Sequence, residues 1–344
     1  MNPSSVRDAA HPSSPLTAEM LAAIETELQE TLVGLLPAPY ADVSAMVRHH
    51  FGWEVGSAPG KRIRPLLTLL TAASAGGDWR NAVPAAAAVE IIHNFSLVHD
   101  DIEDGSETRR GRMTMWKRFG VPQAVNTGDF LHVAASYAVR RLMDRGLPET
   151  TAYAVQRELD QACMDLTLGQ YSDLAFEDRA TVTADDYMRM VGGKTAALLA
   201  AAAAVGACAA AAPTTVFDAY RAFGYRLGMA FQLLDDFLGI WGEPDTTGKS
   251  VSDDLRQGKK TYPVVLGLHR SPAFAHAWVS DRTEMRDVDG LRRALEACGA
   301  DRATRREAER FTQDAVDALQ EAEPRPPAAA ELRALVERLL HRDR

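Results

Sequence analysis

Apolar residues recur at three- and four-residue intervals along most of this chain, which is the spacing of one face of an α-helix. The pattern is plain over 16–36 and again over 82–104, where Pro84 stands in a position typical of a first helical turn. Further helices are predicted over 122–145, 149–177, 184–211, 214–241, 260–279, 303–322 and 328–342. Period-two strands of β-branched residues are nearly absent, so the pattern predicts an all-α fold.

The breaks between these helices are short and rich in glycine or proline, as in "RGLP", "AAPTT" and "EPRPP". They contain no internal linker and no repeat of 20–50 residues. We therefore expect one all-α domain over 16–344. Residues 1–15, rich in Pro, Ser and Ala, are expected to be a disordered tail that could recruit a partner. Residues 280–300 are expected to form a looser connection.

The composition narrows the possible partners and compartments. A net charge of −9 argues against nucleic acid, whose phosphates prefer a basic face. Cys163, Cys208 and Cys298 are far apart, with no zinc or disulfide spacing, and the N-terminus lacks signal-peptide features, so we expect a cytoplasmic protein. The uncharged segment 196–212 is mostly alanine and at the short limit for a membrane span, which favours a buried helix.

The stretch "HNFSLVHDDIEDGSETRRGR" (93–112) carries the first candidate chemistry. Asp100 and Asp104 are four residues apart and share one helix face, with Asp101 beside them. Like charges at this spacing repel one another, so a bound cation is a natural reason for the cluster. Mg²⁺ suits it, because this ion takes one or two carboxylates plus phosphate oxygens. The alternative is a solvated acidic helix end.

Basic residues close to this cluster suggest phosphate groups. Arg109 and Arg110 follow within two turns, and arginine forks match phosphate oxygens. Upstream, "GKRIRP" (60–65) provides a second compact set of cations, and His93 lies on the same predicted helix as the carboxylates. A basic surface patch is the alternative for 60–65. Together these segments indicate a diphosphate site.

A second acidic pair, Asp235 and Asp236, ends an apolar helix in "FQLLDDFLG". The cations Lys249, Lys259 and Lys260 follow it. Two carboxylate clusters on separate helices can hold metal ions between them, with one diphosphate bridging the metals and another on the cationic groups.

The ordered series "GKRIRP", "DDIEDGSETRRG", "GQYSDL", "GGKTAAL", "FQLLDDFLG" and "GKSVSDDLRQGKK" resembles the trans-isoprenyl diphosphate synthases, the polyprenyl synthetase family. The resemblance covers residues 17–340 and is strongest to short-chain bacterial geranylgeranyl diphosphate synthases. It implies an all-α bundle with a central active-site cavity, a homodimer, and no membrane span. It also implies Mg²⁺-dependent head-to-tail condensation of isopentenyl diphosphate with an allylic diphosphate, with three Mg²⁺ ions expected and Mn²⁺ as a substitute.

The resemblance also implies a role for individual residues. Asp100, Asp104 and Asp235 would bind the metal directly, with Asp101 and Asp236 assisting. The homoallylic diphosphate would contact Lys61, Arg64, His93 and Arg110. The allylic diphosphate would contact Arg109, Lys194, Thr195, Gln232, Lys249 and Lys259. Five of these residues would carry the catalysis: Asp100, Asp104, Asp235, Lys194 and Lys249. Asp254 matches an acidic position of the last motif, with Asp253 as a competing register.

One departure leaves a second interpretation open. The second motif ends in Gly239, where the family usually has a third carboxylate. A weakly active regulatory subunit of a hetero-oligomeric synthase is therefore an alternative, against which the intact lysines weigh. A class I terpene cyclase or head-to-head synthase is a further alternative, and the isopentenyl set of cations argues against it.

The residues one turn before Asp100 bear on product length. By the resemblance, the growing chain runs along this helix, and each helical turn rises about 5.4 Å, similar to one isoprene unit. Phe95 is a plausible floor, and Ser96 beside it is small. This combination suits geranylgeranyl diphosphate (C20), with farnesyl diphosphate (C15) as the alternative.

Overall fold

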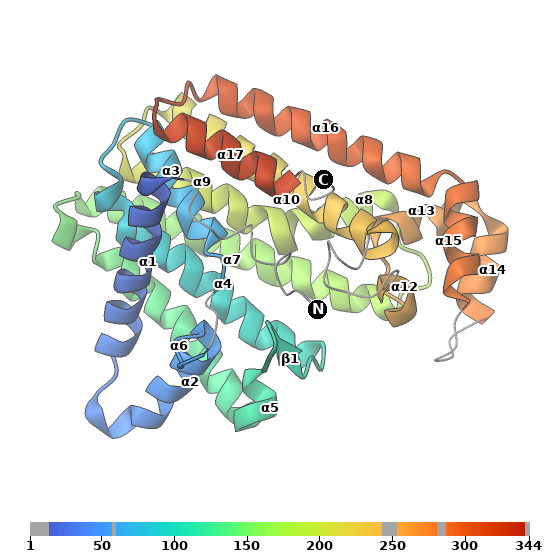
Figure 1. Ribbon diagram of the computed structural model, residues 1–344, viewed down its shortest axis with the longest axis horizontal. Coiled ribbons are helices and arrows are strands. Elements are labelled where there is room, and N and C mark those ends of the chain that lie inside the picture. Colours follow the sequence, from blue (N-terminus) through green and yellow to red (C-terminus); the bar gives the residue numbers. More distant parts are fainter. Residues whose placement is uncertain (1–13, 57–59, 243–252, 281–286, 341–344) are drawn as a thin grey trace.

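The computed structural model describes residues 14–56, 60–242, 253–280 and 287–340, and within them the fold is an all-α bundle (Figure 1). The N-terminal helices are α1 (Pro15–Gly34), α2 (Ala41–Phe51), α3 (Ile63–Ser74), α4 (Val83–Glu103), α5 (Met115–Phe119), α6 (Val121–Arg140) and α7 (Glu149–Asp178). Then follow α8 (Ala184–Val191), a π-helical turn (Gly192–Ala196), α9 (Ala197–Ala209) and α10 (Thr214–Trp241). The last are α12 (Asp253–Gln257), α13 (Tyr262–Arg270), α14 (Pro272–Ser280), α15 (Val288–Ala297), α16 (Ala300–Glu321) and α17 (Ala328–Leu340).

The alanine-rich helix α9 lies in the centre of the bundle, in contact with α3, α4, α7 and α10. Residues 197–207 are all buried, because alanine side chains are small enough for four neighbours to approach closely. By length and composition alone, the stretch Ala184–Ala209 could cross a membrane, yet 83% of its apolar window is buried inside the protein. The prediction of a buried core helix is therefore confirmed.

Two hydrophobic cores organise the helices. The larger core joins α1 to α7 with α9, α10 and α17, and includes the fully buried Phe51, Tyr220 and Phe223. The smaller core surrounds the C-terminal end of α10 with α8 and α13 to α15, and is built on Phe274 and Leu295. In Figure 1, α16 lies along α10 across the top of the bundle, and the contacts between these two helices are extensive. The second acidic motif thus lies beside the smaller core.

Two predicted elements are wrong, one predicted boundary is shifted, and two helices were not predicted. The expected loose connection over 280–300 contains α15, which begins where Asp287 accepts a hydrogen bond from the Gly290 amide and which buries Leu291 and Leu295. The helix predicted over 260–279 is two helices that meet at Ser271 and Pro272. Helices α2 and α3 were not predicted. The tail predicted over 1–15 overlaps α1, because Ser14 caps this helix through the Thr17 amide. Residues 1–13 lie outside the described residues.

A two-stranded hairpin, β1 (Thr108–Arg109) and β2 (Arg112–Met113), follows α4 directly. Arg110 and Gly111 form its two-residue turn, with φ angles of 52° and 73°. Positive φ at both turn residues is the geometry that fits a tight hairpin, although an arginine is an unusual occupant. The hairpin turns the chain back so that Arg109 lies over the carboxylates that precede it.

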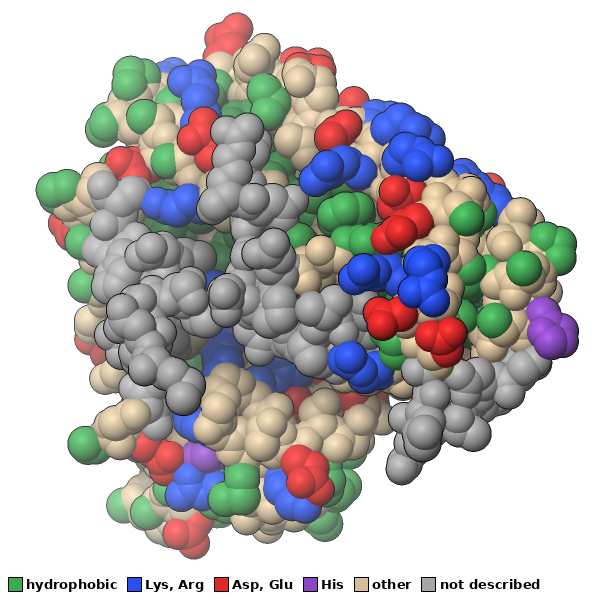
Figure 2. Space-filling model, turned by 45° about the vertical axis from the view of Figure 1, so that its right-hand side comes forward, with side chains coloured by type: hydrophobic (Ala, Val, Ile, Leu, Met, Phe, Trp, Pro, Cys, Tyr) green, Lys and Arg blue, Asp and Glu red, His purple; other side chains and the backbone are tan. Residues whose placement is uncertain are grey.

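Acidic and basic side chains are interspersed on the molecular face shown in Figure 2. Among the described residues visible on that face, the basic side chains alternate with acidic ones.

Candidate active site

The end of α4 and the hairpin after it form the first part of the site. Arg109 donates from Nε to Asp101 Oδ1 (2.7 Å) and from a terminal nitrogen to Asp100 Oδ2 (3.1 Å). Asp101 is almost completely buried, and the Asp100 side chain is 19% exposed. The arginine therefore bridges two neighbouring carboxylates and reduces their mutual repulsion.

The π-helical turn between α8 and α9 connects the first acidic motif with the second. Lys194 in this turn forms an ion pair with Asp173 on α7, and its Nζ lies 3.6 Å from Asp100 Oδ1. The next residue, Thr195, donates to Gln232 Oε1 on α10 (2.9 Å). This π-helical turn therefore contacts both halves of the predicted site. Such turns are frequently found at functional sites.

The two aspartates of the second motif have different surroundings. Asp235 is exposed, whereas Asp236 is 3% exposed. Asp236 accepts hydrogen bonds from the Tyr187 hydroxyl, from Gln232 Nε2 (3.0 Å) and from the Tyr262 amide (3.0 Å). Its carboxylate thus joins α8, α10 and α13.

Gly239, which replaces the usual third carboxylate, lies against Asp254 of α12. A Cβ atom at position 239 would be 1.9 Å from Asp254 Oδ2, much closer than van der Waals contact. Asp254 is 9% exposed. The carboxylate of Asp254 therefore occupies the space that a side chain at 239 would need.

The predicted homoallylic residues come together at the base of the hairpin. Arg64 donates to Nε2 of His93 (3.2 Å), so this ring nitrogen is the acceptor and the imidazole is neutral. A Cβ at Gly60 would lie 2.3 Å from a terminal nitrogen of Arg110, which places this guanidinium directly on the backbone that precedes Lys61. Arg64, His93 and Arg110 thus come together beside the backbone of Gly60 and Lys61, and we call these residues with Lys61 the cationic group.

The sequence pattern of the family described as "Polyprenyl synthetase" matches residues 49–297 of this chain. The geranylgeranyl diphosphate synthase of Mycobacterium tuberculosis is 39% identical over 268 residues, which is 76% of this chain and 73% of that protein. The (2E,6E)-farnesyl diphosphate synthase of Mycobacterium bovis is 39% identical over 311 residues, 86% of this chain and 85% of that protein. The chain belongs to the polyprenyl synthetase family.

This polyprenyl synthetase is therefore a prenyltransferase, and its relatives support a short-chain prenyl diphosphate as the product class. Its fold agrees with a solved structure of geranylgeranyl pyrophosphate synthase from Corynebacterium glutamicum, complexed with isoprenyl diphosphate and magnesium. The TM-score is 0.80 at 28% identity, and the match covers 96% of this chain and 100% of that chain. The expected family and fold class are confirmed.

The carboxylates at the end of α4 have the properties of a cation site. Burial raises the pKa of Asp101 to about 6, although Arg109 opposes the change. Burial and then repulsion from Asp100 raise the pKa of Asp104, against Lys194 and Lys259. Asp101 Oδ2 is buried with no hydrogen-bond partner among the described residues. A divalent cation bound here would satisfy this oxygen and offset the repulsion, so these residues fit Mg²⁺.

Two carboxylates, those of Asp173 and Asp100, keep the neighbouring Lys194 charged. Burial by itself lowers the pKa of Lys194, but Asp173 and Asp100 outweigh burial and raise it. In the described part of the chain, no three His, Cys, Asp or Glu side chains form a ready-made metal cage. A site with few protein ligands leaves coordination positions for phosphate oxygens.

The cationic group at the hairpin base has the opposite balance of charge. Burial, together with Arg64 and Arg110, lowers the pKa of His93 well below its usual value. Arg64 Nε and Arg112 Nη1 are buried donors with no hydrogen-bond partner among the described residues. Buried donors next to surplus positive charge are what an anionic ligand would satisfy.

Sequence reasoning missed His50, Arg112 and Asp173. Arg112 donates to the His50 carbonyl (3.4 Å), and both residues line the recess beside Asp101 and Arg109. Asp173 holds Lys194 and belongs to the "GQYSDL" segment, whose acidic position was an available signal. His50 had no such signal, because α2 reaches the site only through tertiary packing.

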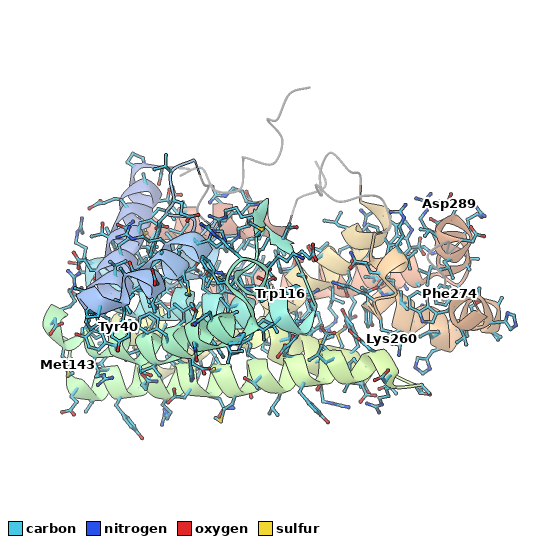
Figure 3. All side chains as sticks on the ribbon, turned by 90° about the horizontal axis from the view of Figure 1, so that it is seen from below. Tyr40, Trp116, Met143, Lys260, Phe274 and Asp289 are labelled. Atoms are coloured by element: carbon cyan, nitrogen blue, oxygen red, sulfur yellow. The ribbon has the colours of Figure 1, made fainter. Side chains whose placement is uncertain are left out.

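The remaining predicted residues are placed as follows. Lys249 lies outside the described residues, and nothing is described of the Asp253 side chain. Lys259 is exposed, and its charge lowers the pKa of Asp104. Lys260 has a structural position at the end of α7 (Figure 3), where Nζ donates to the carbonyls of Phe176, Glu177 and Arg179. A cation at this end of a helix satisfies its last carbonyls.

A separate cavity of about 850 Å³ opens between α7, the π-helical turn and α10. Arg189, Gly193 and Tyr225 are among its lining residues, and none of the predicted site residues lines it. The central active-site cavity of the family thus stays a prediction for this chain.

Proposed function

We propose that this protein condenses isopentenyl diphosphate head-to-tail with allylic diphosphates and releases geranylgeranyl diphosphate. The observation that carries the proposal is the contact of one π-helical turn with both acidic motifs, in addition to a separate group of cations at the hairpin base. This arrangement offers one site for an allylic diphosphate and another for a second diphosphate. Both groups are needed to join two diphosphate substrates.

The allylic diphosphate would lie between the two acidic motifs. Bound Mg²⁺, held by Asp100, Asp104 and Asp235 with Asp101 assisting, would stabilise negative charge on the leaving diphosphate. Arg109 and Lys194 already contact Asp100, so either cation can turn toward a phosphate oxygen when the carboxylate binds metal. We assign Thr195, Gln232, Lys249 and Lys259 to the same diphosphate, and Asp236 to the support of Gln232.

The isopentenyl diphosphate would bind at the hairpin base. Lys61, Arg64 and Arg110 supply the positive charge, and the neutral His93 presents an N–H to the ligand while its other nitrogen accepts from Arg64. The unpartnered donors of Arg64 and Arg112 point to two more contacts. This group holds the second substrate without needing a metal.

The reaction breaks the bond between the allylic carbon and its diphosphate oxygen, which carries the electron pair away. The double bond of isopentenyl diphosphate then attacks the resulting allylic cation, and a proton leaves to the released diphosphate. The cationic side chains stabilise the charge that develops on the leaving group. Apolar helix faces exclude water, which would otherwise capture the cation.

The proposed C20 length rests on the surroundings of Phe95. Its ring packs against His99 one turn later (5.0 Å between centroids) and against His132 of α6 (5.1 Å). Ser96 is small, and its hydroxyl donates to the His93 carbonyl. A single aromatic wall about one turn before the carboxylates favours a chain longer than farnesyl.

We also propose that a second copy of this chain covers α6 and α7, and that the protein works in the cytoplasm. Each helix exposes four large apolar side chains: Val121, Val125, Val133 and Tyr137 on α6, and Tyr153, Met164, Leu168 and Tyr171 on α7. Exposed apolar side chains gathered on neighbouring elements are typical of a protein interface. Light scattering during gel filtration should give twice the 37.4 kDa chain mass.

The test is purified protein with Mg²⁺ and isopentenyl diphosphate, given dimethylallyl, geranyl or farnesyl diphosphate in turn, with products sized after dephosphorylation. A C20 alcohol from all three supports the proposal, and Phe95→Ala should then extend the product to C25. A stop at C15 keeps the reaction but overturns the proposed length. Substrate binding without any elongation would instead favour the regulatory-subunit interpretation, to which Gly239 points.

A further inference from the structure

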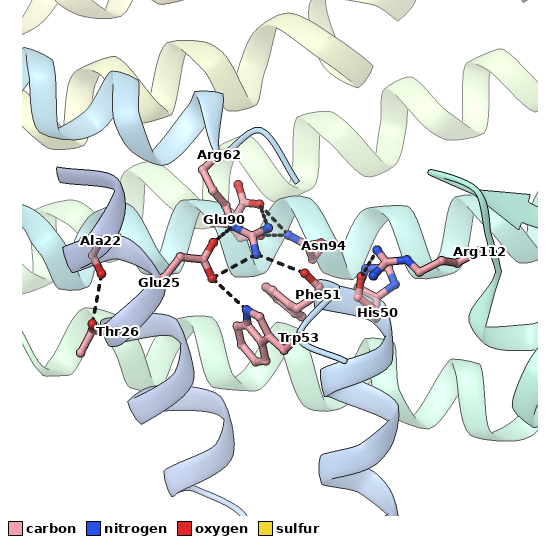
Figure 4. A network of polar contacts seen from close by, with 10 residues as sticks. All are labelled: Ala22, Glu25, Thr26, His50, Phe51, Trp53, Arg62, Glu90, Asn94 and Arg112. Carbon is pink, nitrogen blue, oxygen red and sulfur yellow. Dashed lines mark hydrogen bonds and ion pairs between the residues drawn. The ribbon is translucent and has the colours of Figure 1, made fainter. Parts of the chain in front are cut away.

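Figure 4 shows an ion cluster around Arg62, and its Glu90 is close enough to the proposed isopentenyl site to affect the charge of Arg64 and Arg110. Arg62 of the "GKRIRP" segment is 3% exposed and lies between Glu25 of α1 and Glu90 of α4. Its Nε donates to Glu25 (2.5 Å) and a terminal nitrogen donates to Glu90 (2.9 Å). The sequence places this arginine among the cations of 60–65, but the family resemblance gives diphosphate contacts only to Lys61 and Arg64 on either side of it.

Both glutamates are held by further donors. The Trp53 indole donates to Glu25 (2.8 Å), and the Asn94 amide donates to Glu90 (3.0 Å). Arg62 also donates to the Phe51 carbonyl and lies over the Phe51 ring. A buried charge is tolerated only when its geometry and hydrogen bonds are good, and this cluster is fixed from three helices.

The cluster holds the backbone of Arg62 in an uncommon conformation. Arg62 precedes α3 with φ 50° and ψ 35°, a left-handed conformation that is uncommon outside glycine. Such a conformation persists where its surroundings determine it. The left-handed turn sets the direction in which the chain leaves Lys61 and enters the helix that carries Arg64.

The charges of the cluster also matter to its neighbours. Two carboxylates face one guanidinium, so one negative charge is left over near several cations. Glu90 opposes the burial that lowers the pKa of Arg64 and of Arg110. It thereby helps to keep both guanidinium groups charged before any ligand binds.

We propose that Arg62 is a positioning residue: with Glu25 and Glu90 it locks the left-handed turn that presents Lys61 and Arg64 to the isopentenyl diphosphate. This inference rests on the proposed function of the site. The cluster acts through the phosphate-binding segment and does not touch substrate. It sets the affinity for the isopentenyl substrate and leaves the chemical step unchanged.

The test is Glu25→Gln, which weakens one side of the cluster while Glu90 still neutralises Arg62. We expect KM for isopentenyl diphosphate to rise about ten-fold, because small displacements of binding groups are costly. Both kcat and KM for the allylic substrate should stay within about two-fold. Arg62→Lys keeps the charge without the two-sided contact and should show the same selective rise.

Glu27→Gln is the matched control. Glu27 lies on the same helix, is 1% exposed, and pairs with Arg141 (2.5 Å) and Arg145 (2.9 Å) beside α6, away from the cationic group. It should lower thermal stability without changing KM for isopentenyl diphosphate. An unchanged KM in Glu25→Gln, or an equal rise in Glu27→Gln, would overturn the inference.

Calorimetric titration with inorganic diphosphate in the absence of Mg²⁺ separates the two proposals. Weaker diphosphate binding in Glu25→Gln than in Glu27→Gln supports the positioning role even if the wild type elongates no substrate. Turnover by the wild type with equal diphosphate affinity in both variants would keep the proposed function and reject the positioning role.

Discussion

The two acidic motifs carry the same pair of adjacent aspartates in different surroundings. At the end of α4, Asp100 and Asp101 are paired with the cationic side chains of Arg109 and Lys194. At the end of α10, Asp236 is enclosed by uncharged donors from α8, α10 and α13. The same pair of aspartates is therefore paired with cations in the first motif, whereas in the second motif Asp236 is held by uncharged hydrogen-bond donors.

The largest expected effect is on catalysis through the first motif. Asp100→Asn should lower kcat by about 10³-fold, because it removes a carboxylate that would hold the Mg²⁺ proposed to stabilise the leaving group. The side chain is partly exposed, so the melting temperature should change little. Steady-state product formation and thermal melts measure the two quantities. A loss of activity matched by a loss of folded protein would assign Asp100 a structural role as well.

The second aspartates of the two pairs should differ in stability. Asp236→Ala leaves three donors without their acceptor and should reduce the free energy of unfolding by about 3 kcal/mol. Asp101→Ala loses one ion pair from a carboxylate that burial already disfavours, and should cost about 1 kcal/mol. Urea denaturation compares them directly. Equal losses would remove the distinction between the two motifs.

The contact between Gly239 and Asp254 gives the next effect. Gly239→Ala places a methyl group on Asp254 Oδ2 and should destabilise the fold by about 1–3 kcal/mol. In the double variant with Asp254→Ala the cost should be much less than the sum, since the clash is gone. Thermal melts of the four proteins form a complete cycle. Additive losses would show that Asp254 moves away freely and does not occupy this space.

We expect the loss of folding stability at acid pH to come from the histidines that are buried among arginines near the first acidic motif. Burial lowers the pKa of His50 to about 3, with Arg110 and Arg109 adding to the shift. Below pH of about 6.5 the unfolded imidazole takes up a proton that the folded one refuses. Stability therefore falls as pH drops from 6.5 toward 3, by at most about 1.4 kcal/mol per pH unit from this group.

His50→Gln should flatten that part of the stability profile. The exposed His276 of α14 offers the control, since His276→Gln leaves the buried group in place. Urea denaturation across this pH range compares both variants with the wild type. A profile unchanged by His50→Gln would place the acid sensitivity elsewhere.

Much of the fold was predictable because helix periodicity depends on local residue spacing. The segments of α4, α7, α10 and α16 each carry a long apolar face, and the structure forms them with small changes at the ends. The failures have physical causes. Helices α2 and α15 are short, and a short helix depends on tertiary contacts such as the burial of Leu291 and Leu295. The hairpin turn has Gly111 at its second position, but Arg110 stands at the first, where asparagine, aspartate or glycine is usual.

The residues of the candidate site were likewise only partly predictable from the sequence. The first acidic motif, Lys194 and Gln232 could be identified from their residue types and their positions within the sequence motifs. The structure brings them together. The role of Arg62 was hidden, because its partner Glu25 lies 37 residues earlier on another helix. Neither the fixed position of Asp236 nor the closeness of Asp254 to Gly239 follows from sequence spacing.

The sequence by itself determined the helical class, the family and the residue types available for diphosphate chemistry, because periodicity and ordered motifs are properties of the chain. Only the tertiary structure decided which carboxylate faces a cation, which one joins helices, and which arginine is buried within the substrate-binding segment. Those assignments depend on burial and on partners brought from distant helices. Packing decides them, since the same side chain has a different charge state and a different partner in each environment.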